Sequence, residues 1–271
     1  MLTEEQKTEE NIYNKKIIEI EQKLKNYLLE NYDLNIPKIS LKFKHTFKTK
    51  DFNEKIVKSL NLSPRDAYIS NIVALFHDYG RFAQIKNYNT FNDLASVDHA
   101  DLGIKMLFDN NELCNFINDL TDEELEIVKQ AIKYHNKYVL EEGLTDRQKL
   151  FCNIIRDADK VDIFRILSEN PYCDGLKIGK LEKEDLDNFY DHKLYRLRQE
   201  KNFYTEALLH ISYVYDLNFS MSCKIIDETN SLKMYIYNVL LFTNFKVDKK
   251  LLSCFEYIQR FLKVRASERE N

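Results

Sequence analysis

The stretch Ala74-Leu-Phe-His77-Asp78-Tyr79-Gly80-Arg81 ends an apolar helical run with adjacent His and Asp residues. A neutral imidazole beside a carboxylate offers one borderline and one hard metal ligand. Gly80 is expected to let the backbone leave the helix sharply after this pair. A single His-Asp pair at a helix end also fits a helix cap or a salt bridge, so its meaning depends on the partners that the rest of the chain supplies.

The residues before this pair predict a central helix. Ser63 is a suitable N-cap and Pro64 a suitable first helical residue, so a helix is expected over residues 65–78. Apolar residues cover much of its circumference, which makes His77 and Asp78 interior residues. The apolar set is Ile69, Ile72, Val73, Leu75 and Phe76.

The composition favours an all-α protein. Only five Gly and three Pro occur among 271 residues, too few for the tight turns that a sheet requires. The chain is long enough to bury a core without disulfides or structural zinc. The expected fold is therefore a helical bundle with additional C-terminal helices.

The charge balance and the cysteines indicate a cytoplasmic protein without a membrane partner. Lys and Arg total 40 against 44 Asp and Glu, which argues against a surface for long nucleic acid but allows a local basic groove around a phosphate. No signal-peptide core and no run of about 18 apolar residues occurs. The cysteines are odd in number, lack a CxxC pair and read as reduced and mostly buried. They are Cys114, Cys152, Cys173, Cys223 and Cys254.

Residues 3–33 carry an apolar stripe at helical spacing. We expect this helix to pack on the following domain, and a helix that forms a dimer is the alternative, so the protein is a monomer or a homodimer. Pro37 ends the helix, and a second helix over 41–61 holds His45 near its beginning. The stripe consists of Ile17, Ile20, Leu24 and Leu28.

Residues 82–96 are rich in Asn, Asp, Ser and Thr and are predicted to form a long loop of the kind that often carries function. The next segment, residues 96–103, opens a short helix with His99 in its first turn. Two capping boxes follow. Thr121 with Glu124 starts a helix that runs to His135.

Thr145 with Gln148 starts a helix that runs to Ile166 and contains Asp159. Breakers then gather at Pro171, Gly175 and Gly179, where we expect the main boundary. The predicted domains are an N-terminal helix (1–36), a metal-binding core (37–169) and a C-terminal helical cap (170–271). Helical patterns in the cap cover 182–199, 203–216, 221–242 and 247–265.

The order of these residues resembles the HD superfamily of metal-dependent phosphohydrolases. Its signature is a His, a His-Asp doublet and a distant Asp, which match His45, His77-Asp78 and Asp159. His99 and His135 resemble the extra ligands of the dinuclear branch, and the resemblance covers roughly residues 40–168.

The resemblance implies two divalent metal ions, chosen from Mn, Fe, Co, Ni, Zn and Mg. The first would be held by His45, His77, Asp78 and Asp159, and the second by Asp78, His99 and His135, with Asp78 as a bridge. Such ions activate a hydroxide as the nucleophile, so no side-chain nucleophile is required.

Arg81 is the first candidate for binding the phosphate, as a Lys or Arg does in dinuclear relatives, and Lys160 is the second. Lys160 also fits a solvent-facing residue. Asp98 either orients His99 or carries a proton, or it is a favourable charge at a helix N-terminus. The predicted loop also holds candidates for substrate contact, although turn chemistry explains most of them equally well. They are Gln84, Tyr88, Thr90, Asn92 and Asp93.

The Gly-Tyr-Pro motif of cyclic-dinucleotide phosphodiesterases is absent after His135. The leading interpretation is therefore a phosphohydrolase that cleaves a phosphomonoester or phosphodiester bond of a nucleotide or related small phosphate compound. The alternatives are a cyclic-nucleotide or oligonucleotide phosphodiesterase or nuclease, and an inactive metal- or nucleotide-binding sensor.

Overall fold

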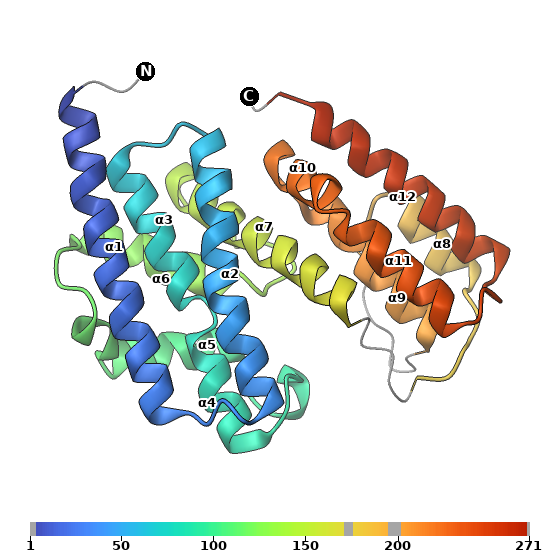
Figure 1. Ribbon diagram of the computed structural model, residues 1–271, viewed down its shortest axis with the longest axis horizontal. Helices are drawn as coiled ribbons and strands as arrows, with labels where there is room; N and C mark the ends of the chain where they lie inside the picture. The colour runs from blue at the N-terminus through green and yellow to red at the C-terminus, as the bar shows by residue number, and fades with distance from the viewer. Residues whose placement is uncertain (1–3, 171–175, 195–201, 270–271) are drawn as a thin grey trace. The chain divides into compact units, whose positions relative to one another are not determined.

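The computed structural model describes residues 4–170, 176–194 and 202–269, all helical or irregular and without a strand (Figure 1). The predicted all-α fold is therefore confirmed. The chain forms two compact units, Met1–Ala158 and Asp159–Asn271, and their boundary falls within α7 (Asp146–Glu169). The predicted domain limits at residues 36 and 169 stay predictions, and Pro171, Gly175 and Cys173 lie outside the described residues.

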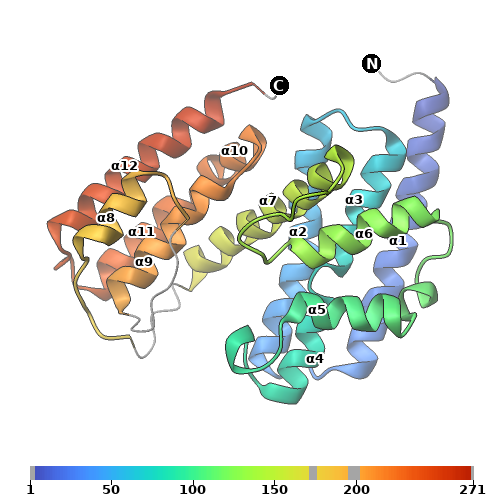
Figure 2. The same ribbon diagram turned by 180° about the vertical axis from the view of Figure 1, so that it is seen from behind.

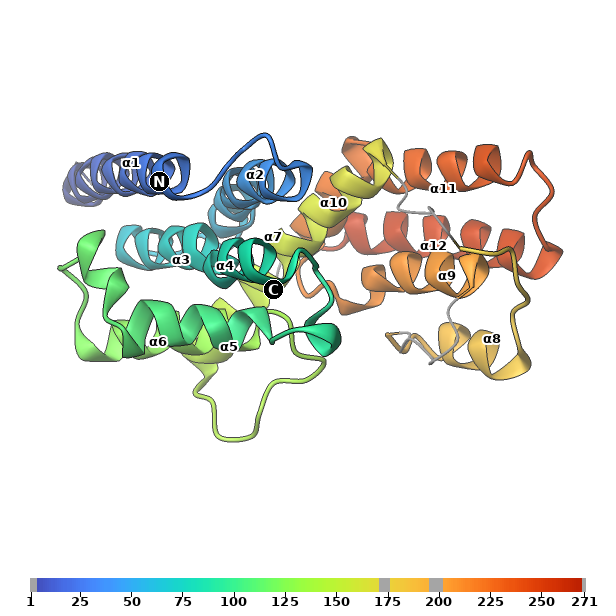
Figure 3. The ribbon, with the colours of Figure 1, turned by 90° about the horizontal axis from the view of Figure 1, so that it is seen from below.

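The first unit consists of three layers of helices, seen edge-on in Figure 3. One layer contains α1 (Glu4–Asn31) and α2 (Pro37–Ser59), the second α3 (Pro64–Phe76) and α4 (Tyr79–Tyr88), and the third α5 (His99–Ile104) and α6 (Asp122–Tyr134). Short helical turns connect them: η1 (Asp93–Ala95), η2 (Lys105–Asp109) and η3 (Glu112–Asn115).

Helix α3 lies at the centre of this unit. Ser63 caps it as predicted, since its side chain accepts a hydrogen bond from Asp66 N. The helix contacts α1, α2 and α6 and is buried on almost every side, which places its C-terminal end, and thus His77 and Asp78, in the interior. The apolar stripe of α1 is buried in the same core, at Ile17, Ile20, Leu24 and Leu28.

The loop predicted over residues 82–96 is wrong in its first half. Helix α4 continues to Tyr88, because Phe82 and Ile85 are three residues apart and both are buried. The irregular segment begins only at Asn89, which ends α4 in the left-handed conformation. Residues 93–95 then form the single turn η1.

Gly80 also differs from its predicted role. The chain bends two residues before the glycine, at Asp78 with φ −103° and ψ 17°, and Gly80 lies inside α4. A Cβ atom at Gly80 would lie 2.2 Å from the His99 carbonyl oxygen and 2.5 Å from Gly103 N. Gly80 therefore allows α4 and α5 to touch, and this contact positions the start of α5 beside the bend.

The second unit is a bundle in which α9, α11 and α12 have roughly aligned axes (Figure 2). The predicted helix over 221–242 is two helices, because Asn230 adopts φ 53° between them. Cys223 and Cys254 are buried here, Cys152 is buried in the first unit and Cys114 is exposed. The helices are α8 (Lys183–Tyr190), α9 (Phe203–Ser212), η4 (Tyr213–Asp216), α10 (Ser220–Glu228), α11 (Ser231–Phe242) and α12 (Lys249–Ser267).

None of the described helices combines the length and the apolar character that a bilayer span requires.

Candidate metal centre

The carboxylate of Asp78 lies between two pairs of histidines. Its Oδ2 is 3.4 Å from His45 Nε2 and 3.6 Å from His77 Nε2. Its Oδ1 is 3.4 Å from His99 Nε2 and 3.7 Å from His135 Nε2. All five side chains are buried, and in each group of three the ligand atoms lie within 4.8 Å of one another.

Four separate segments bring these side chains together. His77 and Asp78 form the junction of α3 and α4, His135 directly follows α6, and His99 is the first residue of α5. His45, which was predicted near the beginning of a helix, lies well inside α2, because that helix already starts at Pro37.

The Nδ1 atoms of His77 and His135, which face away from Asp78, are fixed by hydrogen bonds. His77 Nδ1 donates to the Ala74 carbonyl at 2.8 Å, and His135 Nδ1 donates to the Ile132 carbonyl at 2.7 Å. A carbonyl can only accept, so these contacts place the proton on Nδ1 and leave the Nε2 lone pair facing Asp78.

The charge states suit metal ligation. Burial lowers the pKa of His99 to about 4, so its imidazole is neutral at pH 7. Burial opposes the charge on Asp78, but Lys42 and the surrounding histidines hold the pKa of this carboxyl well below its usual range. Two imidazoles and a carboxylate oxygen on each side are a donor set that divalent transition-metal ions accept, so the residues fit the implied metal ions.

Lys42 is a member of the centre that the sequence analysis missed. Its Nζ lies 2.6 Å from Asp78 Oδ2, and only 15% of its side chain is exposed. It precedes His45 by three residues on α2, a spacing that places both side chains on one helix face. This spacing was the signal that could have identified it.

The Nη1 atom of Arg81 is hydrogen-bonded to the turn after α4, and its Nε atom faces Asp78. Its Nη1 donates to Asp93 Oδ1 at 2.6 Å and to the Phe91 carbonyl at 2.8 Å. Its Nε lies 3.8 Å from Asp78 Oδ1 and has no hydrogen-bond partner in the described part of the chain, although it is buried. A buried donor of this kind is rare unless an acceptor reaches it, and the predicted phosphate role remains a prediction.

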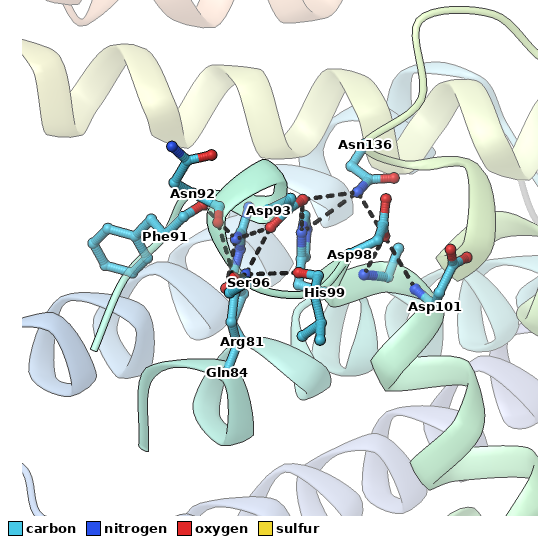
Figure 4. Close-up of polar contacts among 12 residues, drawn as sticks. Arg81, Gln84, Phe91, Asn92, Asp93, Ser96, Asp98, His99, Asp101 and Asn136 are labelled. Carbon is cyan, nitrogen blue, oxygen red and sulfur yellow. Dashed lines mark hydrogen bonds and ion pairs between the residues drawn. The ribbon is translucent and has the colours of Figure 1, made fainter. Parts of the chain in front are cut away.

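Asp93, and not Asp98, is hydrogen-bonded to His99 (Figure 4). Asp98 is the N-cap of α5: its Oδ1 accepts from Ala100 N at 2.9 Å and its Oδ2 lies 2.6 Å from Lys137 Nζ. The expectation that Asp98 orients His99 is thus corrected, because a capping side chain is directed at the helix amides. Its role as a proton carrier stays a prediction.

Asn136 is a second residue that the sequence analysis did not single out. Its Nδ2 donates to Asp98 Oδ1 at 3.1 Å and lies 3.4 Å from Asp93 Oδ2. Its position directly after His135 links the end of α6 to the segment before α5 (Figure 4).

Thr90 and Asn92 shape the turn after α4. Thr90 Oγ1 accepts from Asn92 N at 3.0 Å, and Asn92 Oδ1 accepts from Leu94 N at 3.1 Å. The turn chemistry is thus present, and substrate contact by either residue stays a prediction.

Asp159 and Lys160 belong to the second unit. Asp159 is its first residue, on α7, and Lys160 Nζ lies 2.7 Å from Asp216 Oδ2. Ligation by Asp159 and phosphate binding by Lys160 stay predictions.

Comparison with known families gives one match. The model of the HD domain family matches residues 43–163, a range that contains all six predicted ligands. No curated protein and no solved structure matches the chain significantly. HD domains bind divalent metal ions and define a superfamily of metal-dependent phosphohydrolases. Residues 43–163 of this chain are therefore an HD domain, built around a buried His/Asp cluster that is compatible with metal binding.

Proposed function

We propose that the HD domain binds two divalent metal ions at Asp78 and hydrolyses a phosphoester bond of a nucleotide or related small phosphate compound. One observation carries the proposal: the two oxygens of a single buried carboxylate face separate pairs of imidazole nitrogens. A structural ion pair needs no such division, whereas a bridging carboxylate does.

The first position uses His45, His77 and Asp78 Oδ2, with Asp159 as the predicted further ligand. The second uses Asp78 Oδ1, His99 and His135. Ions held there would supply Lewis acidity, which activates water as a nucleophile and offsets charge on the phosphate.

Two cations of the chain bind and orient the phosphate. Arg81 Nε is buried, lies 3.8 Å from Asp78 Oδ1 and offers an unused donor. Lys42 shares Asp78 Oδ2 with the first position. An ion at the first position would compete with Lys42 for this oxygen, because two cations repel, and the Lys42 ammonium would then be available to a phosphate oxygen.

Side chains of the centre also limit the access of water and provide a group for proton transfer. All four histidines are buried, so bulk water has little access to their rings. Asp98 carries a proton between substrate and solvent in the proposed reaction, and its pKa is lowered, against the effect of burial, by Lys137.

The test uses metal-free protein reloaded with Mn²⁺ and a panel of phosphomonoesters, phosphodiesters, nucleotides and single-stranded oligonucleotides. Wild-type protein is expected to bind Mn²⁺ and to hydrolyse at least one member of the panel. Asp78→Asn is expected to abolish turnover, while Asp101→Asn, an exposed substitution on α5, retains it.

Full activity in Asp78→Asn or in chelator-treated protein would overturn the proposal. Hydrolysis of oligonucleotides that falls steeply with salt would favour the nuclease reading. Equal nucleotide binding without turnover in both wild type and Asp78→Asn would identify an inactive sensor.

A further inference from the structure

The carboxylate of Asp93 connects His99 to α4 (Figure 4). Its Oδ2 accepts a hydrogen bond from His99 Nδ1 at 2.7 Å. Its Oδ1 accepts from Arg81 Nη1 at 2.6 Å and from Gln84 Nε2 at 2.8 Å. One oxygen is thus committed to the histidine and the other to α4.

His77 and His135 are oriented in a different way. The Nδ1 of each donates to the carbonyl three residues earlier in its own helix. Such an acceptor is part of the backbone, so no side-chain substitution removes it. His99 is the first residue of α5 and has no preceding helical turn, so its Nδ1 requires an acceptor from elsewhere in the fold.

The neighbouring carboxylate of Asp98 is not available for this purpose. Its Oδ1 accepts from the amides of Ala100 and Asp101 at the start of α5, and its Oδ2 pairs with Lys137. Asp93 is six residues before His99 and reaches the ring only because residues 90–98 fold back over α4.

Buried groups of α4 hold this turn in place. Gln84 is completely buried, and its Nε2 donates to Ser96 Oγ and to the Val97 carbonyl, both at 2.9 Å, as well as to Asp93. Arg81 donates to the Phe91 carbonyl at 2.8 Å. The position of the Asp93 carboxylate is therefore set before any ligand binds.

From this geometry we infer that Asp93 is a positioning residue that controls the affinity of the second metal position, formed by Asp78 Oδ1, His99 and His135. The inference rests on the proposed function in one respect, that the centre binds divalent ions. A carboxylate behind a ligating histidine fixes the tautomer and the ring orientation, and its removal typically costs about 10–100-fold in metal affinity. Among the described residues Asp93 forms no hydrogen bond or ion pair with His45 or His77, so the first position is expected to keep its affinity.

Calorimetric titration of the metal-free full chain with Mn²⁺ separates the two positions. Wild-type protein is expected to bind two ions. Asp93→Ala is expected to bind one ion with unchanged affinity and the other about 10–100-fold more weakly. Asp93→Asn keeps the size of the side chain and removes its charge, so an intermediate loss at the same position is expected, and this variant decides the question if the alanine variant does not fold.

Asp101→Asn is the matched control, because it alters an exposed carboxylate of α5, two residues after His99, that has no hydrogen bond or ion pair with the ring. It is expected to keep both affinities close to those of the wild type. Near-ultraviolet circular dichroism of each metal-free variant reports whether the core remains packed.

Two outcomes overturn the inference and leave the proposed function standing. One is wild-type affinity at both positions in the Asp93 variants, and the other is an equal loss at both positions. A wild-type chain that binds no Mn²⁺ overturns the proposed function and this inference together.

Discussion

The two sides of Asp78 are built in different ways. On the Oδ2 side, His45 lies within α2 and His77 directly follows α3, so long helices place both rings. On the Oδ1 side, His135 follows α6, but His99 begins a helix of six residues and is oriented by Asp93 from a neighbouring turn. One side is therefore fixed by the helices themselves, while the other depends on how a short non-helical segment folds.

The two sides of Asp78 therefore use the same ligand types, but we expect different substitutions to weaken metal binding at each of them. Perturbations of residues 90–98 or of the α4–α5 contact should affect the Oδ1 side first. Perturbations of α2 or α3 should affect the Oδ2 side, and loss of Asp78 should remove both.

The largest expected effect comes from two separate single substitutions, each of which removes one histidine from one side of Asp78. His77→Ala should lose the first metal position and His135→Ala the second, because each leaves a single imidazole beside its Asp78 oxygen. Hydrolysis should fall by more than the roughly 100-fold that loss of an outer partner costs. Metal content by mass spectrometry and kcat/KM on the best substrate measure both effects.

The control for this pair is His192→Ala in the second unit, whose ring contacts Tyr215 and Tyr257. It should keep two ions per chain. If His77→Ala and His135→Ala both retained full metal content, the assignment of the two sides would be wrong.

The contact between α4 and α5 gives the next largest effect. In Gly80→Ala the new Cβ would lie 2.2 Å from the His99 carbonyl oxygen, so the helices must separate and carry His99 away from Asp78. We expect a loss of about 3 kcal/mol in the free energy of unfolding, measured with urea on metal-free protein. Metal binding at the Oδ1 side should weaken more than at the Oδ2 side.

Gly103→Ala tests the same contact from the other helix. Its Cβ would lie 3.4 Å from Gly80 N, close to ordinary van der Waals contact, and alanine favours a helix over glycine by up to about 1 kcal/mol. Stability should thus stay the same or rise slightly. Equal destabilisation by both substitutions would contradict the asymmetric contact.

An ion pair joins the beginnings of the two helices that end at His77 and His135. Arg65, in the first turn of α3, donates to both carboxylate oxygens of Glu124, in the first turn of α6, at 2.7 and 2.6 Å. Hydrogen bonds from Arg65 lower the pKa of Glu124 to about 2. Because the folded-state pKa is depressed, the pair stabilises the protein above the unfolded-state pKa, and this contribution is lost as the pH falls through about 2.

Glu124→Gln should therefore lower the free energy of unfolding at pH 7 by about 1.5–2 kcal/mol, the range of a hydrogen bond to a charged group. Urea unfolding at pH 7 and pH 3 should show a smaller difference from wild type at the lower pH. A difference that stays constant with pH would mean that the capping box with Thr121, and not the charge, supplies the stability.

Local signals predicted the scaffold well. The cap at Ser63 and the capping box at Thr121 predicted α3 and α6, because a cap depends only on residues within one turn. The burial of His77 and Asp78 could also be predicted from local sequence, because apolar residues cover most of the circumference of α3.

Contacts between distant segments could not be predicted in this way. Asp93 meets His99 only after the turn at residues 90–98 has folded, and the role of Gly80 appears only when α5 lies against α4. The predicted loop included residues 82–88 of α4, although the turn-favouring residues act only from Asn89. Phe82 and Ile85, three residues apart and buried, indicated a helix there instead. The family resemblance could be recognised from the order of the histidines along the chain, and not from the spacing between any two of them.

The smallest expected effect concerns Lys42, the cation on the Oδ2 side. Lys42→Met keeps the length of the side chain and removes the charge beside Asp78. If its ammonium binds a phosphate oxygen during turnover, KM should rise about tenfold, the cost of one hydrogen bond between charged groups, while the number of bound ions stays unchanged. Lys44→Met, an exposed position on the same helix, should leave KM unaltered. A fall in kcat at constant KM would instead assign Lys42 to the metal centre alone, and the Oδ2 side would then contribute ligands without contributing to substrate binding.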